Sequence, residues 1–357
     1  MPRAVLIALD GFPHRAITPE LTPRLWQLGQ QGGRAPEGGR TDLPSSTDPG
    51  FCSLLTGCYP RTHMVRTTSW RYARLPDWVG SEKPRVPTIF DACRQAGVAS
   101  AAVVGDDRGL LATDAADFRW PPNGVIPPGT ATDAHGYPAN REVLPRLLEA
   151  VAGIQHGFLF GHFNESDTVG HDHGPESEAA RASYAATDAV VGQVLDALQE
   201  RWDRTVIVVV SDHDMQGRDQ SAPIELINDG RHPWDLFVPD GGAALVHIVN
   251  DADRPAAARD LLEVDGVEVT AEGGPNMIVA GAKPGRIFAA PRYPKGGFHG
   301  APVTARTVAL VGGGHPAALE LGQAIRRQRP HLADWAPSLA PLLGLDLSTA
   351  EGRNLLG

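Results

Sequence analysis

Short apolar runs alternate along this chain with segments whose apolar residues recur at helical spacing. The apolar runs predict buried strands at 5–8, 98–104, 156–163 and 206–210. Helical spacing predicts helices at 19–30, 88–96, 140–153 and 178–202. Strands that alternate with helices form parallel sheets covered on both faces. We therefore expect an α/β fold with a mainly parallel sheet between helices.

The pattern changes after residue 215, where glycine, proline and charged residues are mixed. Only short strands at 244–249 and 267–270 and a helix at 254–263 are predicted there. A strand at 307–311 and helices at 316–327 and 338–345 then resume the first pattern. We therefore expect a core at 1–215 and 299–357, interrupted by a small α/β cap lobe at 216–298. Residues 32–39, 60–85 and 119–137 are predicted to be irregular.

A helix is predicted to begin near Thr47, because Phe51, Leu54 and Leu55 recur at helical spacing. Asp48 is a candidate N-cap, and Pro49 suits a first turn. A helix N-terminus favours a bound anion, so the Thr47 hydroxyl would lie where a phosphate or sulfate ester docks. The simpler alternative is a turn that only starts a helix.

Acidic residues follow three of the predicted strands. Asp10 follows the first strand, Asp167 the third, and Asp212 with His213 the fourth. Carboxyl ends of parallel strands meet at one edge, where ligands of such folds bind. His171, four residues after Asp167, and a histidine flanked by glycines, His299, complete the candidate set. Taken singly, each residue has an ordinary alternative as a helix cap, surface loop or turn residue.

Three carboxylates and three imidazoles together suit zinc, or manganese as the second choice. Six ligands exceed one tetrahedral site but fit two ions. Two ions about 4 Å apart can stabilise the attacking and leaving oxygens of an in-line phosphoryl displacement.

Composition and charge limit the classes of molecule that this chain can bind. The formal net charge of −10 argues against a nucleic-acid polymer, which needs a basic face. No apolar run is long enough to span a membrane, and the first residues lack a signal-peptide pattern. Three cysteines cannot all pair within one chain, so we expect packed thiols in the cytoplasm. A small anionic substrate stays compatible with this charge, since metal ions reverse the local sign.

Five segments in order resemble the alkaline phosphatase superfamily, closest to its nucleotide pyrophosphatase/phosphodiesterase and phosphonoacetate hydrolase branches. They are LIALDG, PSSTDPGFCSLLTGCYPRTH, NESDTVGHDHGPES, SDHDM and GFHG. The resemblance implies an alkaline-phosphatase-like core and hydrolysis of a small phosphate ester of the nucleotide-like kind. It implies a phosphothreonine on Thr47, aided by the backbone N–H groups that follow it. It also implies two zinc ions, one held by Asp10, Asp212, His213 and Thr47, the other by Asp167, His171 and His299.

The sequence departs from this family in the segment TGCYPRTHMVRTTSW. Thr68 falls where phosphodiesterase-type relatives carry an asparagine that contacts a phosphoryl oxygen. Thr68 and the nearby Arg66 are therefore candidate substrate contacts, unless both simply face solvent. His173 is a further candidate, beside a proposed ligand. Weaker ones are Arg231, His232 and Lys295.

Other activities stay open at this level. A phosphomonoesterase, a hydrolase of phosphonate carbon–phosphorus bonds and an inactive metal-binding scaffold all fit the same residues. A sulfatase is disfavoured, because the arginine of the sulfatase motif is missing after Thr47-Asp48-Pro49. The sequence indicates no particular oligomeric state.

Overall fold

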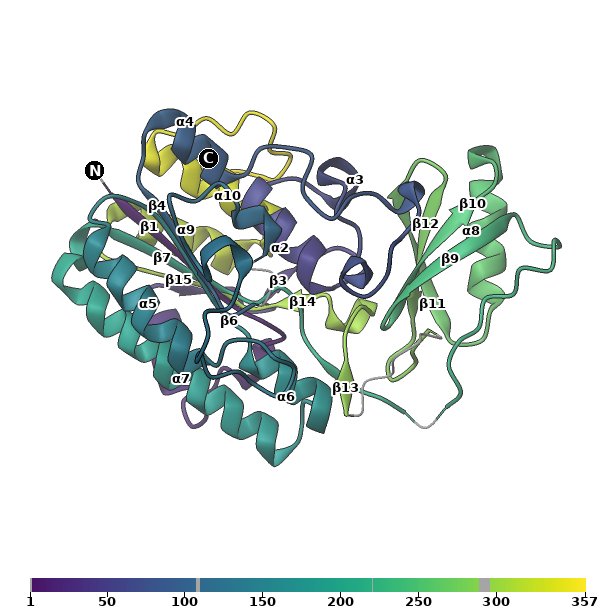
Figure 1. Ribbon diagram of the computed structural model, residues 1–357, viewed down its shortest axis with the longest axis horizontal. Coiled ribbons are helices and arrows are strands. Elements are labelled where there is room, and N and C mark those ends of the chain that lie inside the picture. Colours follow the sequence, from purple (N-terminus) through teal and green to yellow (C-terminus); the bar gives the residue numbers. More distant parts are fainter. Residues whose placement is uncertain (1, 107–109, 220, 289–295) are drawn as a thin grey trace.

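A seven-stranded sheet forms the main body of the computed structural model, which describes residues 2–106, 110–219, 221–288 and 296–357 (Figure 1). Across the sheet the order is β2 (Gly33–Arg34), β15 (Ala309–Gly312), β7 (Thr205–Val210), β1 (Arg3–Leu9), β6 (Gly157–Phe163), β4 (Ser100–Val104) and β5 (Phe118–Trp120). The strands from β7 to β5 are parallel, whereas β15 and β2 each run antiparallel to their neighbour. The expected α/β fold with a mainly parallel sheet is confirmed.

Helices cover both faces of this sheet, and every residue of β1, β6 and β7 is buried. Alternate residues of β1 point to opposite faces. One face packs against α1 (Pro23–Gln31), α5 (Asn140–Gly153) and α7 (Glu178–Leu198). The other packs against α2 (Thr47–Thr56), α4 (Ile89–Ala96), α9 (Pro316–Arg327) and α10 (Trp335–Leu339). Burial on both faces explains why these strands read as continuous apolar runs.

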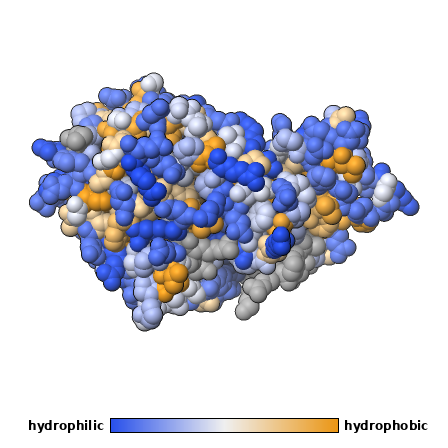
Figure 2. Space-filling model, turned by 45° about the horizontal axis from the view of Figure 1, so that its top comes forward, coloured by the Kyte–Doolittle hydropathy of each residue, from blue (hydrophilic) through white to orange (hydrophobic). Residues whose placement is uncertain are grey.

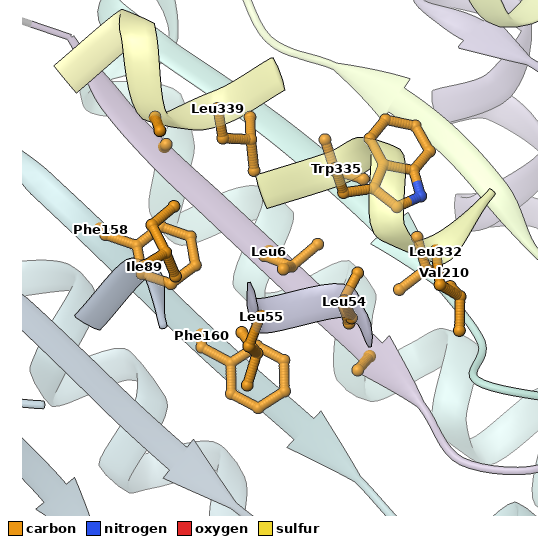
Figure 3. Close-up of a cluster of buried hydrophobic side chains, with 14 of the residues drawn as sticks. Leu6, Leu54, Leu55, Ile89, Phe158, Phe160, Val210, Leu332, Trp335 and Leu339 are labelled. Carbon is orange, nitrogen blue, oxygen red and sulfur yellow. The ribbon is translucent and has the colours of Figure 1, made fainter. Parts of the chain in front are cut away.

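Helix α2 is fixed by its apolar side chains. Leu54 and Leu55 are fully buried in the cluster that contains Leu6 of β1 and Phe160 of β6 (Figure 3). This packing sets the position of the helix and therefore of Thr47, its first residue. The N-cap is Ser46, so the expectation that Asp48 caps the helix is wrong.

Some elements were not expected from the sequence. The polar segment after β6 forms a helix, α6 (Glu165–His173), although it lacks an apolar stripe. Acidic residues in its first turn and histidines in its last turn suit the helix dipole. Strand β5 overlaps the start of the segment 119–137 that was expected to be irregular, and it pairs with β4 at the sheet edge. A short helix, α3 (Pro60–His63), lies in the other long irregular segment.

A second, antiparallel sheet lies beside the main body, at the right of Figure 1. Its order is β11 (Val267–Gly274), β12 (Met277–Ala282), β10 (Ala243–Ile248) and β9 (Trp234–Asp240), and α8 (Arg254–Glu263) packs on it. These two strands were not predicted from the sequence, because β9 contains a proline and β12 a glycine, and both residues are unusual inside strands. In Figure 2 the two parts appear as a larger and a smaller bulk joined by a narrower region.

Two short strand pairs lie outside both sheets. They are β13 (Gly297–Phe298) with β8 (Gln216–Gly217), and β14 (Arg306–Thr307) with β3 (Gly39–Arg40). In the described ranges, no helix has both the length and the apolar character needed to cross a membrane.

Candidate metal centre

The main sheet delivers acidic side chains to one edge. Asp10 follows β1, and Asp212 with His213 follows the neighbouring strand β7. Helix α6, which follows β6 on the other side of β1, carries Asp167 and His171 one turn apart. This is the edge at which parallel strands end, as the sequence predicted.

Six candidate ligands form two groups of three. Ligand atoms of Asp10, Asp212 and His213 lie within 4.8 Å of one another. The same limit holds for the ligand atoms of the second group, which is Asp167, His171 and His299. The structure thus brings together the six residues in the two groups that the family resemblance implies.

Gly11 lets the two groups approach each other. Its φ is +59°, in the region that favours glycine, and an added Cβ would lie 2.8 Å from Asp167 Oδ1. The Ser166 hydroxyl donates to the Asp10 carbonyl oxygen at 2.6 Å. The chain after β1 is therefore held directly against the start of α6.

Each carboxylate in these groups has one buried oxygen without a hydrogen-bond partner in the described part of the chain: Asp10 Oδ1, Asp167 Oδ1 and Asp212 Oδ2. The partner oxygens are held by the protein in two cases. His162 Nε2 donates to Asp10 Oδ2 at 3.0 Å, and the Gly11 N–H donates to Asp212 Oδ1 at 3.2 Å. Buried, unpaired carboxylate oxygens are costly, so they fit a bound cation.

The three histidines of the two groups share one tautomer. Each ring donates its Nδ1–H to a backbone carbonyl: His171 to Gly297 at 2.9 Å, His213 to Asp214 at 3.0 Å and His299 to Ser45 at 3.1 Å. Nε2 of each ring is therefore the nitrogen that remains to bind a metal ion. A backbone carbonyl on the other ring nitrogen is the usual support of a metal-binding histidine.

The electrostatics of the centre also favour cations. Burial, together with the neighbouring carboxylates, raises the pKa of Asp10 well above its usual value. Burial and the Asp167 carboxylate likewise raise the pKa of Asp212, against the effect of His213. Burial and the other two histidines hold the pKa of His299 well below its usual value. Imidazoles beside crowded carboxylates form a donor set that suits zinc or manganese.

Thr47 lies at the first group. Its Oγ1 is 3.5 Å from His213 Nε2, and the residue is 8% exposed. The expected backbone donors after Thr47 are engaged elsewhere, which corrects the sequence-based expectation. The Asp48 N–H donates to Thr68 Oγ1 at 3.1 Å, and the Gly50 N–H donates to the Ser46 carbonyl at 3.0 Å. Pro49 has no N–H.

The hydrogen bond from the Asp48 N–H also places Thr68 next to the residue that follows Thr47. Its hydroxyl oxygen accepts the Asp48 N–H, and its own hydrogen has no acceptor among the described residues. The side chain is 8% exposed. Thr68 is therefore placed to donate one hydrogen bond to a group bound at Thr47.

Arg71, which the sequence reasoning missed, places a cation beside Asp48 at the start of α2. Its guanidinium binds Asp48 through two hydrogen bonds, of 2.9 and 2.6 Å, and Asp106 through one of 2.7 Å. The Arg71 side chain is only 6% exposed. It offsets the negative charge that Asp48 places next to Thr47. The sequence indicates Arg71 only as an arginine near Thr68, and Arg66 fits that description equally well.

The other predicted substrate contacts lie elsewhere. Arg66 donates to the Trp78 carbonyl at 3.2 Å and contacts the Met64 sulfur, so its described contacts involve none of the six ligands or Thr47. His173 is exposed at the end of α6, and within the described ranges its side chain has no hydrogen bond. His232 pairs with Asp260, and Arg231 with Asp229, both in the second part of the molecule. Lys295 lies outside the described residues.

Comparison with known proteins gives consistent findings. The family model of type I phosphodiesterases/nucleotide pyrophosphatases matches residues 4–279. An uncharacterized pyrophosphatase/phosphodiesterase of Schizosaccharomyces pombe is 27% identical over 236 residues, which are 63% of this chain and 47% of that protein. The chain therefore spans about half the length of that relative. A 2,3-bisphosphoglycerate-independent phosphoglycerate mutase of Pyrococcus abyssi is 29% identical over 112 residues, which are 31% of this chain and 25% of that protein.

Two solved structures share the fold. Murine ectonucleotide pyrophosphatase/phosphodiesterase 5, as an inactive threonine-to-alanine variant in complex with AMP, has a TM-score of 0.72 at 16% identity and covers 100% of this chain and 99% of its own. Phosphonoacetate hydrolase from Sinorhizobium meliloti, in complex with phosphonoformate, has a TM-score of 0.65 at 19% identity, covering 87% of this chain and 90% of its own.

Proposed function

Because this chain belongs to the type I phosphodiesterase/nucleotide pyrophosphatase family, we propose that it is a metal-dependent hydrolase of small phosphate esters with Thr47 as its nucleophile. One observation carries the proposal. Three buried carboxylate oxygens without hydrogen-bond partners among the described residues lie with three histidines in two groups, and Thr47 Oγ1 is 3.5 Å from the Nε2 of one of these histidines, His213. Burying carboxylates in this way is costly unless a cation binds between them.

Two zinc ions fit this donor set, with manganese as the alternative. Asp10, Asp212, His213 and Thr47 would hold one ion. The other three ligands, Asp167, His171 and His299, would hold the second. Bound there, the ions would supply positive charge for the phosphoryl oxygens and would lower the pKa of the Thr47 hydroxyl.

The chain's own residues would then act in order. Thr47 Oγ1 would lose its proton to solvent and attack phosphorus, the bond from phosphorus to the leaving oxygen would break, and a phosphothreonine would form. The leaving oxygen takes a proton from solvent. Attack by water then releases the phosphate product and restores Thr47. Thr68 donates its hydroxyl hydrogen to a non-bridging oxygen, in the place of the missing backbone donors.

The proposed substrate is a small phosphodiester, nucleotide-like in size and charge. Family membership and the AMP complex of the murine relative support this class. The second candidate is hydrolysis of a phosphonate, supported by the fold shared with phosphonoacetate hydrolase.

Hydrolysis assays test the proposal. Zinc-loaded protein is expected to hydrolyse bis-p-nitrophenyl phosphate faster than p-nitrophenyl phosphate, and the Thr47→Ala variant is expected to hydrolyse neither. A preference for the monoester would contradict the diester assignment. Phosphate release from phosphonoacetate, without turnover of either aryl ester, would favour the second candidate. Absence of turnover of all these substrates would refute the proposal that the protein is a hydrolase.

Arg71 provides a further prediction. Arg71→Met removes the cation that pairs with Asp48, next to Thr47, and with Asp106. We expect kcat/KM for an anionic ester to fall about tenfold or more, because an uncompensated negative charge repels the substrate. The double variant Asp48→Asn/Arg71→Met should recover most of the loss. Wild-type activity in Arg71→Met, or no recovery in the double variant, would contradict this role.

A further inference from the structure

Asp240, the last residue of β9 in the second sheet, collects three hydrogen bonds on one carboxylate oxygen. Its Oδ2 accepts from Ser46 Oγ at 3.1 Å, from Thr67 Oγ1 at 2.6 Å and from the Thr68 N–H at 3.0 Å. The residue is only 7% exposed. One buried carboxylate therefore joins the residue before Thr47 to the loop that carries Thr68.

The turn that follows Asp240 holds His299. The Gly242 N–H donates to the His299 carbonyl oxygen at 2.8 Å. Gly241 has a φ of +58°, and an added Cβ would lie 2.2 Å from that same oxygen. A side chain at this position would push the turn and His299 apart.

Ser45 links the contacts of Asp240 to those of His299. Its carbonyl oxygen accepts from His299 Nδ1 at 3.1 Å and from the Gly300 N–H at 3.0 Å. Ser45 is bonded covalently to Ser46, whose hydroxyl donates to Asp240. The segment that leads into Thr47 is thus tied to both Asp240 and His299.

We propose that Asp240 is a positioning residue through which the second sheet sets Thr47 and Thr68 against the candidate metal ligands. This inference rests on the proposed function. Hydrogen bonds to a carboxylate are stronger than those between neutral groups, and all three end on one oxygen. The second sheet lies in the segment that the sequence predicts to be an inserted cap lobe. This lobe would therefore help to position the catalytic residues, in addition to any contact that it makes with the substrate.

Asp240→Asn tests this role, because the amide keeps the shape of the side chain and removes its charge. We expect kcat to fall about tenfold, the typical effect of losing charge assistance in a buried hydrogen-bond set, with KM and bound zinc per chain unchanged. Asp235→Asn is the matched control. Asp235 lies on the same strand, pairs with His247 and is half-exposed, so kcat should not change.

A second readout does not depend on turnover. Hydrogen exchange of the Thr68 amide, which donates to Asp240, should become faster in Asp240→Asn and stay unchanged in Asp235→Asn. Ser46→Ala removes one of the three bonds and should give a smaller loss of kcat. Wild-type kcat and wild-type exchange in Asp240→Asn would overturn the inference, as would a loss of kcat that only matches a loss of folded protein. Absence of turnover in the wild type would instead refute the proposed function, and the exchange experiment would still decide the role of Asp240.

Discussion

Replacing Thr47 by alanine is expected to lower kcat for phosphate-ester hydrolysis by roughly 10³-fold or more, the range seen when a covalent nucleophile is removed. Bound metal should remain, because the other ligands of the first group are unchanged. The fold should also remain, since the packing of α2 depends on Leu54 and Leu55 rather than on the hydroxyl. Steady-state kinetics with zinc analysis of the same samples measures both effects.

Thr47→Ser is the matched control. It keeps a hydroxyl at the start of α2 and should retain measurable turnover and a covalent phosphoserine. Full activity in Thr47→Ala would contradict the assignment of the nucleophile. Equal loss of activity in both variants would show that a hydroxyl at this position is not sufficient without the threonine methyl group.

The second large effect is expected from Asp212→Asn. This change removes one carboxylate of the first group, whose Oδ2 is buried without a hydrogen-bond partner in the described structure. We expect the chain to bind about one zinc ion instead of about two, and kcat to fall roughly 10³-fold, because both ions take part in a two-metal displacement. Metal analysis after dialysis and steady-state kinetics measure the two results.

Asp188→Asn is the control for this substitution. Asp188 is also buried, but its carboxylate accepts the backbone N–H groups of Arg24 and Leu25 between α1 and α7. It should lower stability without lowering the zinc content. Loss of one zinc ion from Asp188→Asn, or retention of two ions by Asp212→Asn, would contradict the assigned ligands.

The pKa values of the centre give the sign of the pH effect. Burial raises the pKa of Asp10 and Asp212 above the usual value of 3.8, so in the metal-free protein these carboxyls destabilise the fold increasingly as the pH rises. A metal ion must displace the retained protons. The gain in Tm on adding zinc should therefore be larger at about pH 8 than at about pH 5.

The sequence allowed much of the centre to be predicted because one topological rule applies. Carboxyl ends of parallel strands meet at one edge, so Asp10 and Asp212 had to lie close together. Family membership now confirms the resemblance to the alkaline phosphatase superfamily that the five segments indicated. Helix α6 was missed because it has no apolar stripe, although its ligands Asp167 and His171 were singled out by their spacing.

Contacts between distant segments could not be predicted in the same way. Asp240 reaches Ser46 across 194 residues, and the strand that carries it was itself missed. Arg71 and Arg66 are equally plausible partners of an anion in the sequence, and only the path of the loop separates them. The engagement of the Asp48 N–H by Thr68 likewise depends on that loop.

Titration of the metal-free protein with zinc, followed by hydrolysis of bis-p-nitrophenyl phosphate, tests the central claim most directly. The two groups of three ligands predict that activity rises until about two zinc ions are bound per chain, and then stays constant. The same titration of Thr47→Ala should show two bound ions and no turnover. Full activity without metal, or a maximum at one ion per chain, would contradict a two-metal centre built on these residues.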